Sequence, residues 1–469
     1  MTSGDGDFGL LAPVYAGTPA AAATSDVAWV RAMLDAEAAL ARAQARLGLI
    51  EPAHAAAVSE AANAMAPDPA ELACAARGGG NPVIPLVREL TQAVAVRSAA
   101  AAECVHLGAT SQDIMDTAAM LVASRVLRLL LADLARVAAS LAEQADAHRG
   151  TVMVARTLTQ HAVPTTFGRK CAGWLDPVLD ARDGVRGILA DGLPVQLGGA
   201  AGTLASMEEY RRRAGAPGSV VDVLASFAAE LLLAEPRLPW HTARTPIAGL
   251  AGALSIAGGA LGKIALDVET LSRPEIGELA EPVGHGRGGS STMPHKRNPV
   301  LSTLIVSAAR QLPSCTQLLT QSMVAEDERP AGAWHAEWRP LREALRLAGG
   351  AAHTAVALAG GLSVFPQRMV ANLALTGGQV MAERLSVVFG AMLGRDTAKD
   401  VLGEASRRAA RDGRSLREVL RELPELAGKY TAAELTELLD PAGYLGASDE
   451  LIDRVLTRWQ DGRREGEDG

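Results

Sequence analysis

The chain has 469 residues, enough for two to four domains at roughly 100 to 200 residues per domain. Hydrophobic residues make up 48% of it but aromatic residues only 3%, which favours closely packed helices rich in Ala, Leu and Val. The net charge is −8, and Lys and Arg are scattered along the chain, which argues against a nucleic-acid-binding or membrane-surface protein.

The four cysteines, Cys74, Cys104, Cys171 and Cys315, lie far apart and form no Cys-x-x-Cys pair. This spacing indicates neither a disulfide framework nor a zinc site, and the nine histidines show no metal-ligand spacing. The first residues, MTSGDGDFGLL, lack the basic segment and apolar run of a secretory signal. We therefore expect a cytoplasmic protein without a metal site.

The N-terminal part, residues 1–108, is predicted to form a small helical domain. Between Asp26 and Leu47 apolar residues recur every three or four positions, which is typical of one face of an amphipathic helix. A stretch broken by Pro and Gly follows, and another helix is expected near Ile84.

The central part, residues 109–364, is predicted to form a bundle of long helices. The longest covers 114–148, where neither Gly nor Pro occurs, and the others are expected at 164–189, 247–271, 299–312 and 341–362. The uncharged stretch 347–367 is rich in Ala and Gly and carries His353, so we interpret it as buried helix rather than a membrane span.

The C-terminal part, residues 365–469, is more charged and is predicted to form a third helical domain. Its short helices are expected at 369–375, 377–393, 398–412, 416–423 and 432–439, followed by a loose polar tail over 461–469. No segment alternates apolar and polar residues convincingly enough to predict a sheet. The predicted fold class is all-α, with three helical domains and a central bundle of long helices.

The first polar segment is VHLGATSQDIMDTA, residues 105–118, just before the longest helix. Thr110 or Ser111 stands where an N-cap is expected, with Asp113 in a near capping-box position. These hydroxyls either cap the helix only, or hold a carboxylate together with the amides of the first turn. His106 is either a buried structural imidazole or an acid/base group beside that anion.

The second polar segment is VARTLTQHAVPTTFG, residues 154–168. Arg156, Thr157, Gln160 and His161 interrupt an apolar context, in a loop of the kind that often carries function. Taken alone, His161 is more often structural than catalytic.

The third segment, EPVGHGRGGSSTMPHKRNPV, covers residues 281–300 and is the most specific of the three. Its four glycines predict a lid that is ordered by a ligand. Two adjacent serines follow, and a serine hydroxyl could act as a base if amides, a nearby cation and a closed site stabilised its alkoxide. Asn298 could simply cap the following helix, and Arg297 could be a solvated charge. No Walker pattern supports a nucleotide site.

These segments resemble the fumarase/aspartase superfamily, whose signature loop GSSxMPxKxN stands here at residues 289–298. The longer string MPHKRNP resembles the branch of adenylosuccinate lyase and carboxymuconate cycloisomerase. Five further segments are most similar to bacterial 3-carboxy-cis,cis-muconate cycloisomerases: HLGATSQDIMDTA, RTLTQHAVP, VQLGGAAGT, PWHTARTP and ERPAGAWHAEW. The resemblance covers nearly the whole chain.

The resemblance implies a homotetramer in which three subunits contribute to each active site, and a reaction without a cofactor at a carbon beside a carboxylate. In the cycloisomerases a carboxylate oxygen of 3-carboxy-cis,cis-muconate, a small tricarboxylate, adds across a conjugated double bond. The product is 4-carboxymuconolactone, in the protocatechuate branch of the β-ketoadipate pathway. This addition is the reverse of a β-elimination.

The resemblance also assigns roles to residues of the three segments. Ser290 transfers the proton, while Lys296 and Asn298 polarise the carboxylate beside the reacting carbon. His106 and His161 orient the substrate or move protons. The remaining candidates would bind substrate carboxylates: Thr110, Ser111, Arg156, Thr157, Gln160, Arg244, Arg273 and Arg329. For Arg244, Arg273 and Arg329, which lie outside the three segments, a structural salt bridge is an equally good interpretation.

One departure from the superfamily pattern bears on the reaction. Many of its lyases have Arg-Thr-His where this chain has Arg156-Thr157-Leu158, and Leu158 cannot move a proton. This argues against adenylosuccinate and argininosuccinate lyase activity and favours a cycloisomerase, with His161 and then His106 as the partner of Ser290. The alternatives are a lyase that releases fumarate from another substituted succinate, such as a nitrosuccinate-type lyase, and a non-enzymatic structural protein of the same fold.

Overall fold

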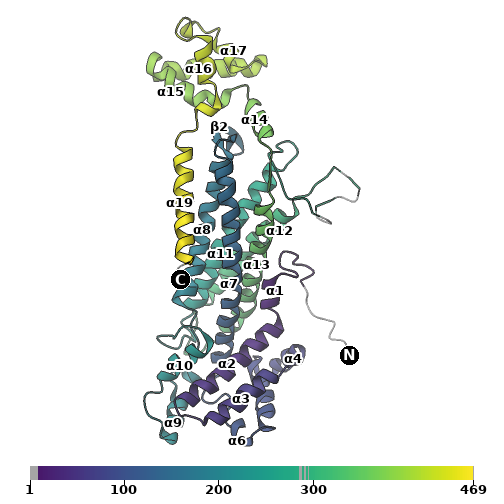
Figure 1. Ribbon diagram of the computed structural model, residues 1–469, viewed down its shortest axis with the longest axis vertical. Helices are drawn as coiled ribbons and strands as arrows, with labels where there is room; N and C mark the ends of the chain where they lie inside the picture. The colour runs from purple at the N-terminus through teal and green to yellow at the C-terminus, as the bar shows by residue number, and fades with distance from the viewer. Residues whose placement is uncertain (1–8, 285–287, 290–291, 294, 468–469) are drawn as a thin grey trace. The chain divides into compact units, whose positions relative to one another are not determined.

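The computed structural model describes residues 9–284, 288–289, 292–293 and 295–467. These residues form nineteen α-helices and four short strands, which confirms the predicted all-α class (Figure 1). The chain forms two compact units, each made of separate segments. Unit 1 comprises Met1–Leu134, Ala181–Gly262 and Leu304–Thr354, and unit 2 comprises Ala135–Asp180, Lys263–Thr303 and Ala355–Gly469. The three-domain division after residues 108 and 364 stays a prediction.

Unit 1 contains the N-terminal helices, of which α2 shows how the sequence specifies them. Helix α2 (Asp26–Arg46) begins where the Ser25 hydroxyl accepts a hydrogen bond from the Ala28 amide at 3.2 Å. It ends before Gly48, which adopts φ +73°. The other short helices of this unit are α1 (Pro19–Ala23), α3 (Pro52–Ala64), α4 (Pro69–Gly79), α5 (Val83–Ala95), α6 (Ala99–Ala102), α9 (Ala205–Ala214), α10 (Asp222–Leu231) and the 3₁₀ turn η1 (Gly199–Ala201).

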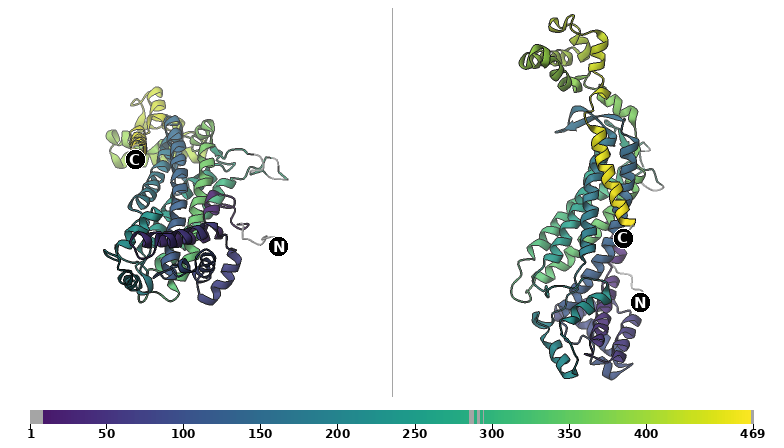
Figure 2. Two further views of the ribbon diagram at one scale, coloured as in Figure 1. Left: turned by 60° about the horizontal axis from the view of Figure 1, so that its bottom comes forward. Right: turned by 60° about the vertical axis from the view of Figure 1, so that its left-hand side comes forward.

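Five long helices each contribute residues to both units, and they correspond to the helices predicted for the central part of the chain. They are α7 (Ser111–Ala147), α8 (Phe167–Asp191), α11 (Thr245–Leu271), α12 (Val300–Gln321) and α13 (Ala333–Gly360). Within each unit their segments lie side by side (Figure 2).

Two of these helices are longer than predicted because proline does not end them. Helix α12 continues through Pro313 to Gln321, and α13 begins before Pro340. A proline in a helix removes one backbone hydrogen bond. Packing along the remaining turns outweighs that loss here.

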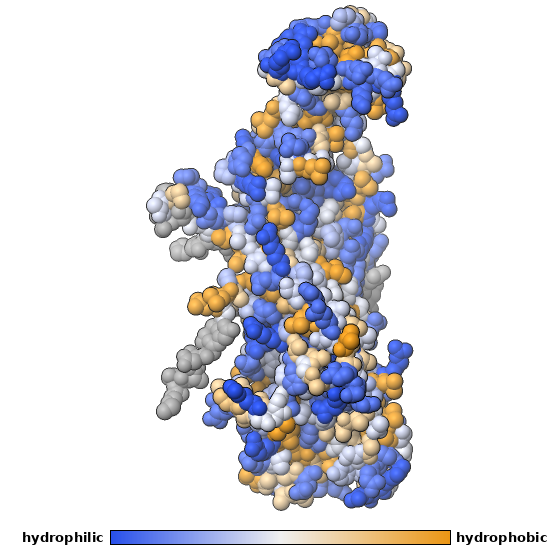
Figure 3. All heavy atoms as spheres, turned by 180° about the vertical axis from the view of Figure 1, so that it is seen from behind, coloured by the Kyte–Doolittle hydropathy of each residue, from blue (hydrophilic) through white to orange (hydrophobic). Residues whose placement is uncertain are grey.

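Small residues allow close approach of α11 and α12 within unit 1. A Cβ atom at Gly258 would lie 2.1 Å from Leu312 Cδ1, and one at Gly262 would lie 2.5 Å from Ala309 Cβ. Helix α11 is the one described helix whose length and composition would suffice to cross a membrane, yet half of its most apolar stretch is buried. Apolar and hydrophilic residues are interspersed on the face drawn in Figure 3.

Unit 2 contains two small antiparallel sheets, so the prediction of no sheet was wrong. Strands β1 (Val152–Thr157) and β2 (Gln160–Thr166) form a hairpin, and β3 (Leu279–Ala280) pairs with β4 (Ser363–Val364). Helix α8 begins at Phe167 rather than near Pro164, because residues 160–166 extend the hairpin.

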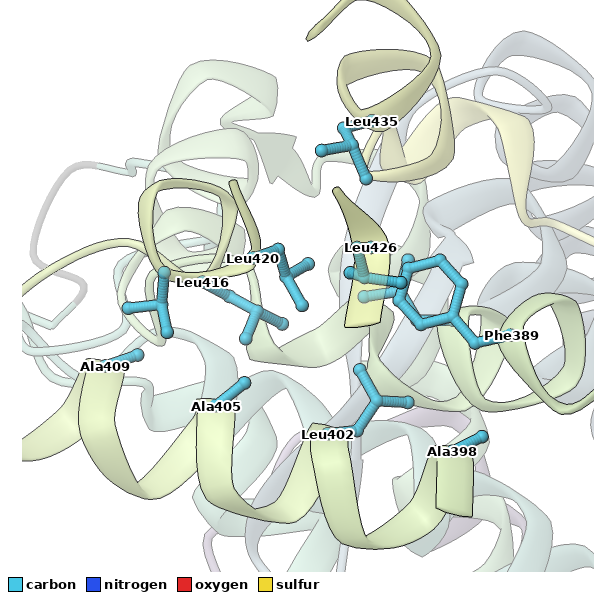
Figure 4. Close-up of a cluster of buried hydrophobic side chains, with 11 residues drawn as sticks. Phe389, Ala398, Leu402, Ala405, Ala409, Leu416, Leu420, Leu426 and Leu435 are labelled. Carbon is cyan, nitrogen blue, oxygen red and sulfur yellow. The ribbon is translucent and has the colours of Figure 1, made fainter. Parts of the chain in front are cut away.

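The C-terminal helices of unit 2 enclose their own apolar core. Phe389 of α15 and Leu402 of α16 are buried together with leucines of the following helices (Figure 4). These elements are α14 (Pro366–Ala374), η2 (Gln379–Met381), α15 (Ala382–Leu393), α16 (Arg395–Asp412), α17 (Leu416–Leu420), η3 (Pro424–Leu426), α18 (Ala432–Leu438), η4 (Pro441–Gly443) and α19 (Ser448–Glu467). Helix α19 reaches Glu467, so the tail predicted to be loose from residue 461 is helical there. Good helix formers such as Arg and Glu extend it.

Candidate active site

Thr110 directly precedes α7 and Ser111 is its first residue, and both are half-buried. The Arg329 guanidinium donates a hydrogen bond to Thr110 Oγ1 at 2.8 Å. The Ser111 and Gln112 amides have no hydrogen-bond partner among the described residues. Two hydroxyls, two open amides and an arginine therefore meet at a helix N-terminus, an arrangement suited to a carboxylate.

A buried carboxylate holds this helix start in place. Asp113 is fully buried and accepts hydrogen bonds from the amides of Thr110, Gly198 and Gly199 at 2.9–3.0 Å. Its Oδ1 also lies 2.7 Å from His241 Nε2. The predicted capping interaction is thus present in one direction, from the Thr110 amide to Asp113. Its link to the loop around Gly198 was not predicted.

Arg244, predicted as a candidate for a substrate carboxylate, lies in a buried ion-pair network instead. Its five N–H groups donate to Asp116, Glu337 and the Trp240 carbonyl, with the shortest distances 2.7 Å to Asp116 and 2.6 Å to Glu337. Burial raises the pKa of Glu337 against the opposing effect of Arg244. No donor of Arg244 remains for a ligand, so the geometry supports the structural interpretation.

His106 is paired with a buried acid. Its Nδ1 lies 2.7 Å from Glu37 Oε1, and its backbone adopts φ +58°. Burial disfavours the protonated ring, but the Glu37 charge and hydrogen bond outweigh this, so the pKa of His106 lies above its usual value. His106 is therefore better suited to orient or protonate a group than to act as a base.

The hairpin of unit 2 carries the second predicted segment. Arg156 pairs with His161 across the strands and Thr157 with Gln160, and the connecting residues Leu158 and Thr159 have φ +50° and +69°. Two residues with positive φ form a type I′ turn, which normally favours Asn and Gly. Thr157 and Gln160 are exposed, and the Leu158 side chain is 95% exposed.

Near its tip, the hairpin is bound to a buried carboxylate that sequence reasoning missed. Arg156 donates two hydrogen bonds to Glu278, at 2.7 and 3.0 Å, and Asn372 donates a third at 2.7 Å. Arg156 is predicted to bind substrate, but two of its N–H groups donate to Glu278 instead. Burial, and then the charge of Arg156, lower the pKa of His161 against the opposing charge of Glu278. His161 Nδ1 is buried without a partner among the described residues, so His161 is suited to accept a proton.

Part of the predicted lid lies outside the described residues, including Ser290. Of the described residues that follow in the sequence, Lys296 is exposed and Asn298 is half-buried. The Asn298 amide donates to the Gly288 carbonyl at 2.9 Å. Gly288 has φ +69°, and a Cβ there would lie 2.7 Å from the Asn298 carbonyl oxygen, so this position requires glycine.

The helix after the lid is capped by an acid that precedes the lid. Glu281 accepts hydrogen bonds from the Leu301 and Ser302 amides, at 3.0 and 2.7 Å. Glu281 therefore does the N-capping that was one interpretation of Asn298, and the Asn298 side chain has no such bond among the described residues.

The predicted site residues fall into two groups. His106, Thr110, Ser111 and Arg329 belong to unit 1, and Arg156, Thr157, Gln160, His161, Lys296 and Asn298 belong to unit 2. In the part of the chain that the structure describes, no group of three or more His, Cys, Asp or Glu residues is placed to hold a metal ion.

Comparison with known proteins shows the family. Residues 6–313 match the lyase family model, and residues 378–455 match the model for the adenylosuccinate lyase C-terminus. The nitrosuccinate lyase of Streptomyces davaonensis is 55% identical, covering 96% of this chain and 94% of that protein. The 3-carboxy-cis,cis-muconate cycloisomerase of Pseudomonas aeruginosa is 43% identical, covering 94% of each chain.

A solved structure shares the fold over almost the whole chain. The crystal structure of 3-carboxy-cis,cis-muconate lactonizing enzyme from Pseudomonas putida matches with a TM-score of 0.89 and 38% identity, covering 97% of this chain and 99% of that one. The chain therefore belongs to the lyase family of the fumarase/aspartase superfamily and is an enzyme of that superfamily.

Proposed function

We propose that this protein is a nitrosuccinate lyase, which eliminates nitrite from 2-nitrosuccinate to give fumarate. The observation that carries the proposal is the 55% identity to the Streptomyces davaonensis nitrosuccinate lyase over 96% of the chain. The cycloisomerase of Pseudomonas aeruginosa, at 43%, is less similar over nearly the same length.

The chemistry of the hairpin tip supports a leaving group of this kind. A lyase that expels an amine needs a general acid to protonate the leaving nitrogen. Nitrite is a weak base and leaves as a stable anion, so no acid is needed at that position. Leu158, at the tip of the hairpin and without an ionisable group, is compatible with nitrite as the leaving group.

Four residues have proposed roles in the elimination step. Ser290 takes a proton from the CH₂ carbon, and Lys296 and Asn298 stabilise the charge that develops on the adjacent carboxylate. The C–H electron pair becomes the new C=C bond, and the C–N pair leaves with nitrite. His161, whose neutral form is favoured, accepts the proton from Ser290.

The start of α7 serves as the carboxylate anchor. Thr110, Ser111 and Arg329 hold one substrate carboxylate, and Thr157 and Gln160 help to orient the other end. His106, paired with Glu37, orients rather than deprotonates.

The active enzyme is a cytoplasmic homotetramer in this proposal, with each site shared between subunits. The resemblance of the three polar segments to the fumarase/aspartase superfamily supports this assembly. Light scattering tests the assembly, because a monomer would exclude shared sites.

A second candidate is the cycloisomerization of 3-carboxy-cis,cis-muconate. The lactonizing enzyme from Pseudomonas putida shares the fold at a TM-score of 0.89. In this reaction a carboxylate of the substrate adds to the double bond, and this carboxylate, like nitrite, needs no acid or base partner. Leu158 is therefore compatible with this reaction as well.

Purified protein offered each substrate in turn separates the two candidates. We expect kcat/KM for 2-nitrosuccinate to exceed that for 3-carboxy-cis,cis-muconate by at least about a hundredfold. The opposite ratio would replace the lyase proposal with the cycloisomerase, and cleavage of adenylosuccinate instead would reject both.

A further inference from the structure

The chain that leads into the predicted lid is held on both sides in unit 2. Strand β3 ends at Ala280, which pairs with Ser363 of β4. Two residues further on, Pro282 packs against Gly361, where an added Cβ would lie 2.5 Å from Pro282 Cβ. Glu281 lies between these two contacts, so its backbone is a fixed point from which its side chain can act.

The Glu281 side chain takes the place of a helix cap for α12. Helix α12 begins at Val300, so the residue before it, where a capping side chain is expected, is Pro299. Proline has no side-chain acceptor. Both Glu281 carboxylate oxygens accept hydrogen bonds instead, at 3.0 Å from the Leu301 amide and 2.7 Å from the Ser302 amide. These are the second and third amides of the helix, the positions that a capping side chain normally binds.

This contact is stronger than an ordinary cap because it involves a charge. Unpaired amides give the N-terminus of a helix a partial positive charge. A carboxylate there is stabilised both by this charge and by charge-assisted hydrogen bonds. Glu281 therefore ties the first turn of α12 to the end of β3.

Asn298, proposed to stabilise charge on the substrate carboxylate, is attached to this first turn. Its carbonyl accepts a hydrogen bond from the Val300 amide at 2.9 Å, and its amide donates to the Gly288 carbonyl at 2.9 Å. The Asn298 side chain has no hydrogen-bond partner among the described residues. Its placement therefore depends on the backbone at the start of α12, which Glu281 holds.

We propose that Glu281 is a positioning residue for the reaction. By holding the first turn of α12 to β3, it places the Asn298 side chain where it can stabilise the charge that develops on the substrate carboxylate. This inference rests on the proposed function, which gives Asn298 that task. Because the charge develops only in the transition state, loss of Glu281 should lower kcat and leave KM nearly unchanged.

Nitrite release from 2-nitrosuccinate by the full-length enzyme tests the proposal. Glu281→Ala removes both acceptors, and we expect kcat to fall at least about tenfold, with KM within about twofold of the parent value. Glu281→Gln keeps one acceptor oxygen, so its kcat should lie between those of Glu281→Ala and the parent. Glu275→Gln is the matched control, because Glu275 is exposed in the turn before β3 and should keep the parent kcat.

A double-mutant cycle distinguishes positioning from a general loss of stability. In an Asn298→Ala background, Glu281→Ala should lower kcat by less than about twofold more, because the side chain that it positions is already gone. In a Thr110→Val background, which alters unit 1, it should again lower kcat about tenfold. Glu281→Gln takes its place in the cycle if Glu281→Ala does not fold.

Three results would overturn the proposal: the parent kcat in both Glu281 variants, a raised KM without loss of kcat, or equal losses in the two backgrounds. A parent enzyme that releases no nitrite would reject the lyase function instead. The same cycle is then measured with 3-carboxy-cis,cis-muconate as the substrate, so the two failures are distinguishable.

Discussion

His161 is the residue whose chemistry depends most on its surroundings. Its neighbours Arg156 and Glu278 shift its pKa in opposite directions, with burial and Arg156 prevailing. A neutral imidazole with an unpaired buried nitrogen is suited to take a proton from Ser290.

Replacing Glu278 with Gln tests this assignment. The change removes the charge that favours protonated His161 and leaves Arg156 unopposed, so the pKa of His161 should fall further. The acid limb of the kcat/KM profile should then move to lower pH. A limb that stays in place would show that another group sets it, while a purely structural loss would lower the rate equally at every pH.

The raised pKa of His106 predicts that the stability of the fold depends on pH. Its pKa is raised in the folded state, so its extra protonation stabilises the fold fully below the unfolded value of about 6.5. This contribution fades as the pH rises through the raised pKa. His106→Asn should therefore cost about 1–3 kcal/mol near pH 6 and clearly less near pH 9, measured by thermal or urea unfolding.

His148 provides the control for this pH dependence. Burial lowers the pKa of His148, so the sign is reversed. His148→Asn should show no larger loss at low pH than at high pH. Equal losses for His106→Asn at both pH values would contradict a charged pair with Glu37.

At the scale of elements, the junction of α7 and α8 leaves no room for a side chain at Gly168. A Cβ there would lie 2.5 Å from the Ala145 carbonyl oxygen and 2.8 Å from two backbone atoms, at His148 and Arg149. Backbone atoms cannot rotate away as a side chain can, so Gly168→Ala should destabilise the protein by about 3 kcal/mol or more.

Gly187 in the same helix is the matched control. A Cβ there meets nothing within 4 Å, so Gly187→Ala should be neutral or stabilising by up to about 1 kcal/mol. Unfolding midpoints of the two variants give the comparison. Similar midpoints would contradict the close approach at Gly168.

The elements also show what a sequence can predict. Long helices were predictable because apolar periodicity persists over many turns. The end of α12 and the start of α13 were predicted wrongly at Pro313 and Pro340, because packing keeps both helices intact through these prolines. The hairpin was missed because its turn, Leu158-Thr159, lacks the usual Asn-Gly signal.

For the site, motifs gave the residue types but not their partners. Glu37 and Glu278 are far in sequence from His106 and Arg156, and only the folded chain brings each pair together. Arg244 shows that a residue type alone can also suggest a role that the structure does not support. An arginine that resembles a ligand-binding residue in sequence is fully occupied by Asp116 and Glu337.

At the scale of the whole molecule, the proposed shared site predicts complementation between inactive variants. Thr110→Val alters the unit 1 group and His161→Gln the unit 2 group, and each alone should lose most activity. Mixed tetramers reassembled from both should regain up to about a quarter of the parent activity, because some sites then receive an intact residue from each subunit. No recovery would place each site within one chain.

A mixture of Thr110→Val and Ser111→Ala is the control for complementation. Thr110 directly precedes α7 and Ser111 is its first residue, so every mixed site carries one of the two changes. We expect this mixture to stay as inactive as its two components.

The central claim is that the protein eliminates nitrite from 2-nitrosuccinate. Colorimetric nitrite and chromatographic fumarate, measured in one reaction with purified protein, test it most directly. The proposal predicts one nitrite per fumarate, and a loss of at least about a hundredfold in Ser290→Ala without loss of the assembled fold. Fumarate and nitrite at background levels, with conversion of 3-carboxy-cis,cis-muconate to a lactone by the same preparation, would contradict it.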